Sequence, residues 1–378
     1  MSKKRKHRKQ KRVSAALIRV IAAAVCLAAA FGLLALARQT GWFADWHTTH
    51  VYPLFVGTLG RFCDLFRFSV VEILLYALIV TVLITLVISA VRVGKNLHAK
   101  RGKKAFAPLG HWASHVVLTA AALFLLYVLT CGINYERTAF SAEAGLHRQP
   151  VSTEDLRLTC EVLIAEVNAE VAAVPFDEAG SSVMPEDGEA IAKVCMERLS
   201  ENYPCLQGFY PHPKGLLVSR ILSVQELAGV YSPFTVEANY NREMPTLEKP
   251  LTLCHELSHL RGFMREDEAN FIAYLACRTS DNAVFRYAGS QIALTHCLNA
   301  YYRAAGADRY WEVYAQLDER AVQDRRLQAQ WWDQFEGPIA ETSQKVNDSY
   351  LKANNQTEGV KSYGRMVDLL VAYVKENR

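Results

Sequence analysis

The stretch Pro250-Leu-Thr-Leu-Cys-His-Glu-Leu-Ser-His-Leu-Arg-Gly262 places two histidines, His255 and His259, four positions apart. Residues four apart lie on one face of an α-helix, so both imidazoles can contact a single metal ion. Glu256 directly follows the first histidine, and its carboxylate can reach a water molecule bound to that ion. The stretch therefore predicts a helix with two metal ligands and one general base, around which the second half of the chain folds.

These residues form the H-E-x-x-H pattern that is typical of zinc hydrolases. Such a short pattern also arises by chance, in roughly two of every hundred chains of this length and composition. In a catalytic site, zinc lowers the pKa of its bound water, and Glu256 takes that proton and passes it to the leaving amine. Tyr287 is a candidate hydrogen-bond donor to the developing oxyanion, although packing in a core is the more common role of such a tyrosine.

Two histidines leave a catalytic zinc ion one protein ligand short. Gly262 can end the metal helix with a positive φ and turn the chain back. If a second helix begins near residue 265, Glu266 and Asn270 share a face, so Glu266 could bind the metal and Asn270 could orient an imidazole. Glu268 is the rival ligand, because it lies about 200° round the helix from Glu266 and only one of them can face the metal. Alternatively, these acids are only favourable charges at a helix N-terminus.

Three long apolar runs, residues 20–37, 73–91 and 116–133, occupy the first third of the chain. Their lengths approach or reach that of a bilayer-spanning helix, so each predicts a transmembrane segment. Residues 39–69 are rich in aromatic side chains, which favours an interfacial or partly re-entrant connection. A cleaved signal peptide is the alternative for the first run, but two more runs follow it and no small-residue cleavage site closes it.

Basic residues indicate how the chain crosses the membrane. Eight Lys and Arg residues lie in the first twelve positions, and residues 92–104 contain six more and no acidic residue. The positive-inside rule places both segments in the cytoplasm, so three spans put everything after about residue 135 outside it. We thus expect a multi-pass protein of the cell membrane with the lipid bilayer as a partner. Without its basic tail the chain is slightly acidic, so no nucleic-acid partner is expected.

The sequence predicts a basic cytoplasmic tail (1–19), a membrane domain with three transmembrane helices (20–134) and an extracytoplasmic domain (135–378). The last part is large enough for its own core. We expect a mostly α fold, in which the three transmembrane helices precede a zincin-like α+β domain with a small sheet and many helices. The helices expected after the metal motif cover residues 267–278, 290–304, 308–328 and 365–376.

Two runs, 215–223 and 229–241, have the character of β-strands. The second lies just ahead of the metal motif, where a zincin domain usually has an edge strand that holds extended substrate by main-chain hydrogen bonds. An ordinary hairpin or loop is an equal alternative for residues 232–241.

Nine cysteines are present, none of them in C-x-x-C spacing, so a cysteine-based zinc site is not expected. Free buried thiols are the expectation for most of them. A Cys195–Cys205 disulfide is the alternative if the domain faces an oxidising space.

Glu266-Asp-Glu-Ala-Asn270, downstream of the two histidines, resembles the gluzincin pattern, in which a glutamate four residues before an Asp or Asn is the third zinc ligand. The glutamate lies closer to the second histidine here than in well-studied gluzincins. The resemblance implies His255, His259 and Glu266 as ligands, and it favours Glu266 over Glu268.

The whole chain also resembles a bacterial membrane-protein family classed as a domain of unknown function (number 3810). This resemblance implies a zinc-peptidase-like domain and names no substrate. Besides the three spans, the matching stretches are Phe68-Ser-Val70, Asn134-Tyr135, Ser232-Pro-Phe-Thr-Val-Glu-Ala-Asn239, His255 to Gly262, Glu266-Asp-Glu-Ala-Asn-Phe271 and Gly359-Val-Lys-Ser-Tyr-Gly364.

The leading hypothesis is a membrane-anchored zinc metallopeptidase that acts on a peptide or protein substrate. The alternative is a membrane-tethered binding or sensory domain with a structural zinc ion or an inactive site. Glu256 favours catalysis, because a structural site needs no general base. The sequence leaves the oligomeric state open.

Overall fold

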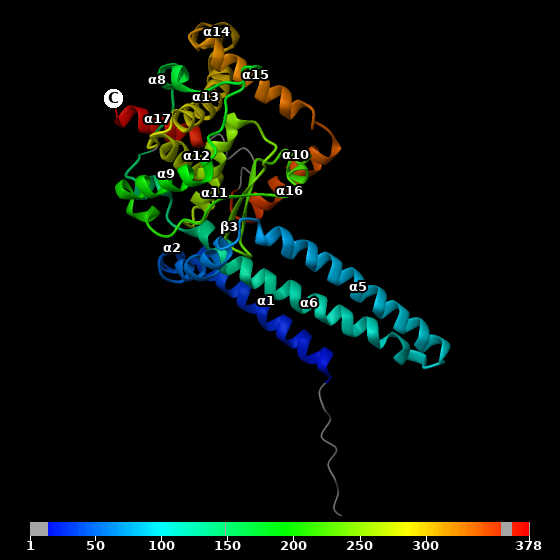
Figure 1. Ribbon diagram of the computed structural model, residues 1–378. Coiled ribbons are helices and arrows are strands. Elements are labelled where there is room, and N and C mark those ends of the chain that lie inside the picture. The colour runs from blue at the N-terminus through cyan, green and yellow to red at the C-terminus, as the bar shows by residue number, and fades with distance from the viewer. Residues whose placement is uncertain (1–13, 148, 357–364, 378) are drawn as a thin grey trace, which may run out of the picture. The chain divides into compact units, whose positions relative to one another are not determined.

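The computed structural model describes residues 14–147, 149–356 and 365–377. The described chain is mostly helical and contains one small sheet (Figure 1). This confirms the prediction of a mostly helical chain with a small sheet and three apolar helices near its N-terminus. The first thirteen residues of the basic tail and the whole family-like stretch Gly359–Gly364 lie outside the described residues.

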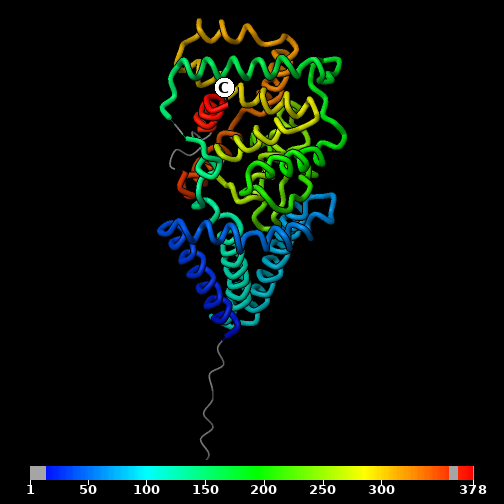
Figure 2. The backbone as a smooth tube through the Cα atoms, turned by 90° about the vertical axis from the view of Figure 1, so that its left-hand side faces the viewer, coloured from blue at the N-terminus to red at the C-terminus, as the bar shows by residue number. Residues whose placement is uncertain are grey.

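The chain divides into two compact units, of which unit 1 comprises Met1–Leu36 and Ile73–Leu129. Unit 1 contains most of three long helices, which lie side by side in Figures 1 and 2. By length and composition each of the three helical runs is able to cross a membrane, and each run contains one of the predicted spans. They are α1 (Ala15–Gln39), α5 (Val70–His98) and α6 (Ala107–Tyr127), the last lying within a continuous helical run over Gly102–Glu136.

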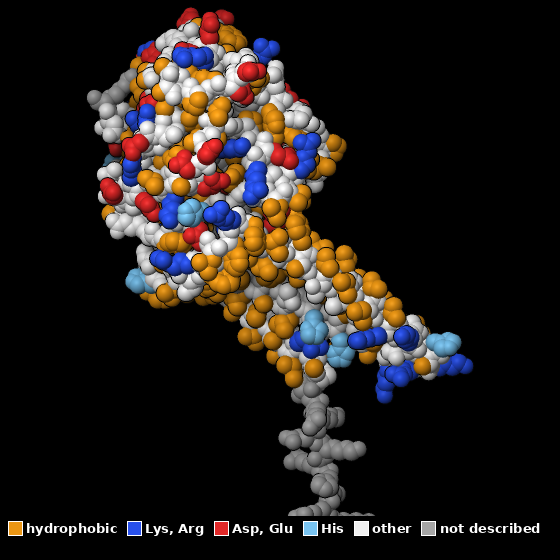
Figure 3. All heavy atoms as spheres, viewed as in Figure 1, with side chains coloured by type: hydrophobic (Ala, Val, Ile, Leu, Met, Phe, Trp, Pro, Cys, Tyr) orange, Lys and Arg blue, Asp and Glu red, His pale blue; other side chains and the backbone are white. Residues whose placement is uncertain are grey.

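Few polar contacts join these three helices. Arg19 Nε donates to Ser114 Oγ at 2.9 Å between α1 and α6, and Trp112 Nε1 donates to Thr85 Oγ1 at 3.2 Å between α6 and α5. Hydrophobic side chains cover the face of the helices that is visible in Figure 3, while Lys, Arg and His gather at their ends. This distribution is typical of helices that lie in lipid.

Unit 2 comprises Ala37–Glu72 and Thr130–Arg378. The connection between the first two spans, which the sequence assigns to the membrane domain, therefore packs with the residues after 130. This connection is one helical run from Gly41 to Asp64, with π-helical turns at His47–Val51 and Val56–Gly60. Its α-helical parts are α2 (Gly41–Trp46), α3 (Tyr52–Phe55) and α4 (Arg61–Asp64).

The core of unit 2 is built from helices that pack around the metal motif (Figure 1). They are α8 (Thr153–Glu170), α9 (Gly188–Asn202), α11 (Lys249–His259), α12 (Glu266–Arg278), α13 (Ala283–Ala305) and α17 (Arg365–Glu376). The remaining helices are α7 (Phe140–Glu143), α10 (Arg220–Ser223), α14 (Ala307–Tyr314), α15 (Glu319–Asp333) and α16 (Pro338–Ala353).

Local capping explains several helix boundaries. Ser152 and Asp155 form a reciprocal capping box that starts α8. Asn282 caps α13, which begins at Ala283 and not at the predicted 290. The prediction of one helix over 308–328 is wrong, because Asp318 accepts from Arg320 N and starts a new helix, α15. No helix is predicted from the sequence over the residues of α16.

The sheet has three short strands in the order β1-β3-β2. Strand β3 (Glu237–Tyr240) pairs in parallel with β1 (Lys214–Gly215) and antiparallel with β2 (Gly229–Ser232). The run 229–241 is therefore a hairpin, and its first strand lies at an edge of the sheet. The predicted strand over 215–223 is wrong beyond Gly215, because the Glu72 carboxylate accepts the N–H groups of Leu217 and Val218 and the chain then turns into α10.

Candidate metal centre

Helix α11 carries the two histidines of the metal motif. Pro250 lies in its first turn, where a missing N–H is tolerated, and every residue from there to His259 is buried. After the helix, Gly262 has a φ of +79°, as the sequence predicts. A Cβ at Gly262 would lie 2.7 Å from Thr48 Cγ2, so both the backbone conformation and the close approach require glycine here.

The ligand atoms of three predicted residues converge. His255 Nε2 lies 3.1 Å from His259 Nε2 and 3.2 Å from Glu266 Oε2. Glu266 Oε1 lies 4.0 Å from His259 Nε2. One ligand atom from each residue lies within 4.8 Å of the others, the spacing that a single metal ion needs.

The other nitrogen of each imidazole has a partner that fixes its orientation. His255 Nδ1 lies 2.9 Å from Asn270 Oδ1, which is the role expected for Asn270. His259 Nδ1 lies 2.7 Å from the carbonyl oxygen of Phe263, which the sequence analysis missed. These contacts direct the Nε2 atom of each ring toward the point that Glu266 also faces.

Glu256 lies against the edge strand. A Cβ at Gly229 of β2 would be 2.4 Å from Glu256 Oε1, so only glycine leaves room for this carboxylate. Its other oxygen, Oε2, is buried and has no hydrogen-bond partner among the described residues. Burial raises the pKa of Glu256 to about 8, although the charge of His255 acts in the opposite direction.

The two histidines have opposite pKa shifts. Burial lowers the pKa of His259 to about 4, and the charge of His255 lowers it further. Burial alone would also lower the pKa of His255, but the hydrogen bond and charge of Glu266 outweigh it and raise that pKa above its ordinary value. Glu266 therefore stabilises the charged form of His255, and a cation competes with a proton for these ligand atoms.

Two other predicted residues do not join the cluster. Glu268 is buried and accepts from Arg265 Nη1 at 3.0 Å, so Glu266 and not Glu268 lies with the histidines. The Tyr287 hydroxyl donates to Asp324 Oδ2 at 3.0 Å and accepts from Gln291. Burial raises the pKa of Tyr287, and its role is that of a packed core tyrosine.

Two tyrosines that the sequence analysis did not single out connect the metal helix to other elements. Tyr52 donates to the carbonyl oxygen of His259 at 3.1 Å, and its hydroxyl lies 3.0 Å from that of Tyr231 on β2. Tyr231 in turn donates to the carbonyl oxygen of Thr130 at 3.2 Å. No local sequence pattern indicates this contact, because its members come from three distant parts of the chain.

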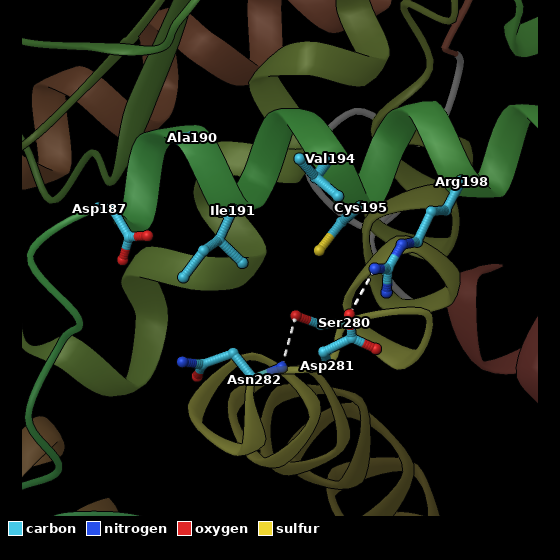
Figure 4. A pocket seen from close by; sticks show the side chains of 9 residues that line it. All are labelled: Asp187, Ala190, Ile191, Val194, Cys195, Arg198, Ser280, Asp281 and Asn282. Carbon is cyan, nitrogen blue, oxygen red and sulfur yellow. Dashed lines mark hydrogen bonds and ion pairs between the residues drawn. The ribbon is translucent and has the colours of Figure 1, made fainter.

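A separate cavity of about 360 Å³ lies between α9 and the segment after α12 (Figure 4). Arg198 forms an ion pair with Asp281 at this cavity, and the Cys195 sulfur lines it. Behind Cys195, the thiols of Cys254 and Cys277 lie 4.0 Å apart. All nine cysteines are free thiols, Cys195 and Cys205 included, so no disulfide holds the back of the metal helix.

These features define a mostly helical protein with three helices able to cross a membrane and a buried His-His-Glu cluster. The chain belongs to the family described as protein of unknown function (DUF3810), whose sequence model matches residues 47–371. No curated protein and no solved structure matches the chain. The matched region begins in the connection that contains Tyr52 and includes the whole cluster.

Proposed function

We propose that this protein is a membrane-anchored zinc metallopeptidase. The observation that supports it best is the convergence of His255 Nε2, His259 Nε2 and one Glu266 oxygen within 4.8 Å, directly beside Glu256. Two imidazoles and one carboxylate are a common ligand set of catalytic zinc, and they leave a coordination position for water or substrate.

The residues around the cluster fit a zinc ion. Both imidazoles are fixed by acceptors at Nδ1, and Glu256 Oε2, buried and without a hydrogen-bond partner among the described residues, would be available to accept a proton. When bound, zinc supplies a Lewis acid that makes water acidic near neutral pH. Glu256 accepts the proton of the attacking water and returns it to the leaving nitrogen.

The edge strand supports a peptide as the substrate. Asn241 N donates to the carbonyl oxygen of Ala228 at 2.8 Å, which fixes the hydrogen-bond pattern of the hairpin. Because antiparallel pairing alternates, the peptide groups of Gly229 and Tyr231 point away from β3, toward the edge of the sheet. An extended peptide can pair with such an edge, and Gly229 would then hold it next to Glu256.

The proposal is tested with the full-length protein in detergent, as wild type and as Glu256→Gln. We expect about one zinc ion per chain in both proteins by inductively coupled plasma mass spectrometry. Cleavage of a peptide library should fall by about 10²- to 10⁴-fold in the variant, because the general base is lost. Glu248→Gln, at the start of α11, is the matched control that should retain activity.

Two results would contradict the proposal. A wild-type protein without stoichiometric metal would exclude a zinc enzyme. A wild-type protein that binds zinc but cleaves no library peptide would leave the cluster as a metal site without peptidase activity.

A further inference from the structure

The helical run from Gly41 to Asp64 has two different faces. One face is buried within unit 2 and includes Tyr52 and Val56. The opposite face exposes large apolar side chains, which are Trp42, Trp46, Leu54 and Phe62. Because the run continues directly from α1 and leads into α5, its exposed face has the composition and the position of an interfacial membrane helix.

The buried face of this run touches the metal helix. Tyr52 donates to the carbonyl oxygen of His259, and Thr48 packs against Gly262. The residues that follow the third apolar helix make similar contacts, since Arg137 Nη1 donates to the carbonyl oxygen of Arg261 at 2.8 Å. Within unit 2, the metal site therefore lies next to segments by which the chain enters and leaves its apolar helices.

A groove of about 750 Å³ lies between α16 and the residues that lead into the edge strand. Val224 and Leu227 form one wall, just before β2, and Ile339, Val346 and Tyr350 of α16 form the other. Ile339 and Val346 have 60% and 64% of their surface exposed. None of the lining residues is charged, and Gln225, Thr342, Ser343 and Asn347 add hydrogen-bonding groups among the apolar ones.

Two residues that line this groove adjoin features already described. Leu227 is two residues from Gly229, which packs against Glu256. The Tyr350 hydroxyl accepts from Tyr135, just beyond the third apolar helix, at 3.3 Å. The lining of the groove thus includes one residue close in sequence to the edge strand and one that contacts the segment after the third apolar helix.

We propose that this groove binds an uncharged, largely apolar stretch of another polypeptide, immediately outside that polypeptide's own transmembrane helix. The substrates of the metal site are then membrane-anchored proteins that are cut in their juxtamembrane segment. The cleavage rests on the proposed peptidase function, whereas the binding does not. The uncharged lining selects against charged segments. Gln225 and Thr342 already donate to carbonyl oxygens four residues earlier in the chain, whereas the Ser343 and Asn347 side chains offer a polypeptide hydrogen bonds that a lipid acyl chain cannot make.

The test uses full-length protein in phosphatidylcholine vesicles, with Glu256→Gln to prevent turnover. A photo-crosslinking amino acid replaces Val346, and in a matched control it replaces Val183, an exposed apolar residue away from the groove. The probe is a synthetic polypeptide with one transmembrane helix followed by fifteen uncharged, mostly apolar residues. A second probe contains only those fifteen residues.

We expect at least about tenfold more crosslinking of the anchored probe than of the soluble probe at position 346, and little crosslinking of either probe at 183. Ile339→Glu should reduce the crosslink at 346 about tenfold, because it places a charge in the groove. Ile339 is exposed, so this variant should fold.

Equal crosslinking of the two probes would overturn the membrane-anchored source of the ligand. A position-346 crosslink to lipid or to a second copy of this chain, in place of the probe, would overturn the proposed occupant. If the anchored probe crosslinks but wild-type protein does not cleave it, the groove proposal holds and the peptidase proposal fails.

Discussion

At the scale of single residues, orientation distinguishes the acidic side chains near the two histidines. Glu266 and Glu268 belong to the first turn of α12, yet only Glu266 contacts His255. Glu268 faces Arg265 and is buried elsewhere. Residues two positions apart on a helix point about 200° away from each other, so a single helix cannot present both carboxylates to one ion.

This difference predicts opposite effects for two isosteric substitutions. Glu266→Gln should weaken zinc binding by more than the roughly 10- to 100-fold that loss of an outer-shell partner costs, because a direct ligand is removed. Glu268→Gln should retain the metal. Zinc titration against a competing chelator measures both affinities, and metal loss in Glu268→Gln alone would contradict the assignment.

Asp324 gives a pH dependence that is independent of the metal site. Burial raises its pKa above the ordinary value of 3.8, although Ser182 N and the Tyr287 hydroxyl donate to it. As the pH rises above 3.8, the unfolded chain loses this proton while the folded chain still holds it. The free energy of unfolding should therefore fall with rising pH in the window just above that value.

Asp324→Asn should flatten this part of the pH profile, because the asparagine cannot ionise. Thermal unfolding of both proteins in detergent at a series of pH values measures the effect. Identical slopes for the two proteins would show that Asp324 does not contribute.

At the scale of elements, the fit between β2 and α11 positions Glu256, the proposed general base. Any side chain at Gly229 would meet Glu256 Oε1 at 2.4 Å. Gly229→Ala should therefore displace the carboxylate and lower kcat about 100-fold, the usual cost of misplacing a catalytic group by about 1 Å. Zinc content should not change.

Val230→Ala is the neighbouring control, because Val230 is exposed on the same strand. Peptide cleavage and zinc content measured together distinguish a displaced base from a lost metal. Full activity in Gly229→Ala would mean that Glu256 is not held by this contact.

The helical run between α1 and α5 predicts a spectroscopic signature. Trp42 and Trp46 lie on its exposed apolar face, so brominated lipids in vesicles should quench their fluorescence. The Trp42→Phe/Trp46→Phe variant should show much weaker quenching than wild type. Trp331→Phe/Trp332→Phe is the control pair, and an equal loss of quenching there would contradict an interfacial position of the run.

At the scale of the whole molecule, the basic residues predict how the chain crosses the bilayer. The loop between α5 and α6 contains exposed lysines, Lys103 among them, which favour the cytoplasm. In intact cells a membrane-impermeant maleimide should therefore label Glu178→Cys in unit 2 but not Lys103→Cys. Both should react after lysis, and the reverse pattern in intact cells would invert the proposed orientation.

Local spacing in the sequence was sufficient for several features of this protein. The four-residue interval places His255 and His259 on one face of any helix, and Gly262 can end that helix because glycine readily adopts a positive φ. The three apolar helices follow from composition and length. These features depend on residues close together in the chain, and local sequence therefore predicts them.

Only the tertiary structure decided the rest. It selected Glu266 over Glu268, because that choice depends on how α12 packs against α11. The approach of Tyr52 to the metal helix, and the Glu72 carboxylate that ends the strand after Gly215, join residues more than a hundred positions apart. Such contacts arise from packing between distant segments, which no local pattern of side chains encodes.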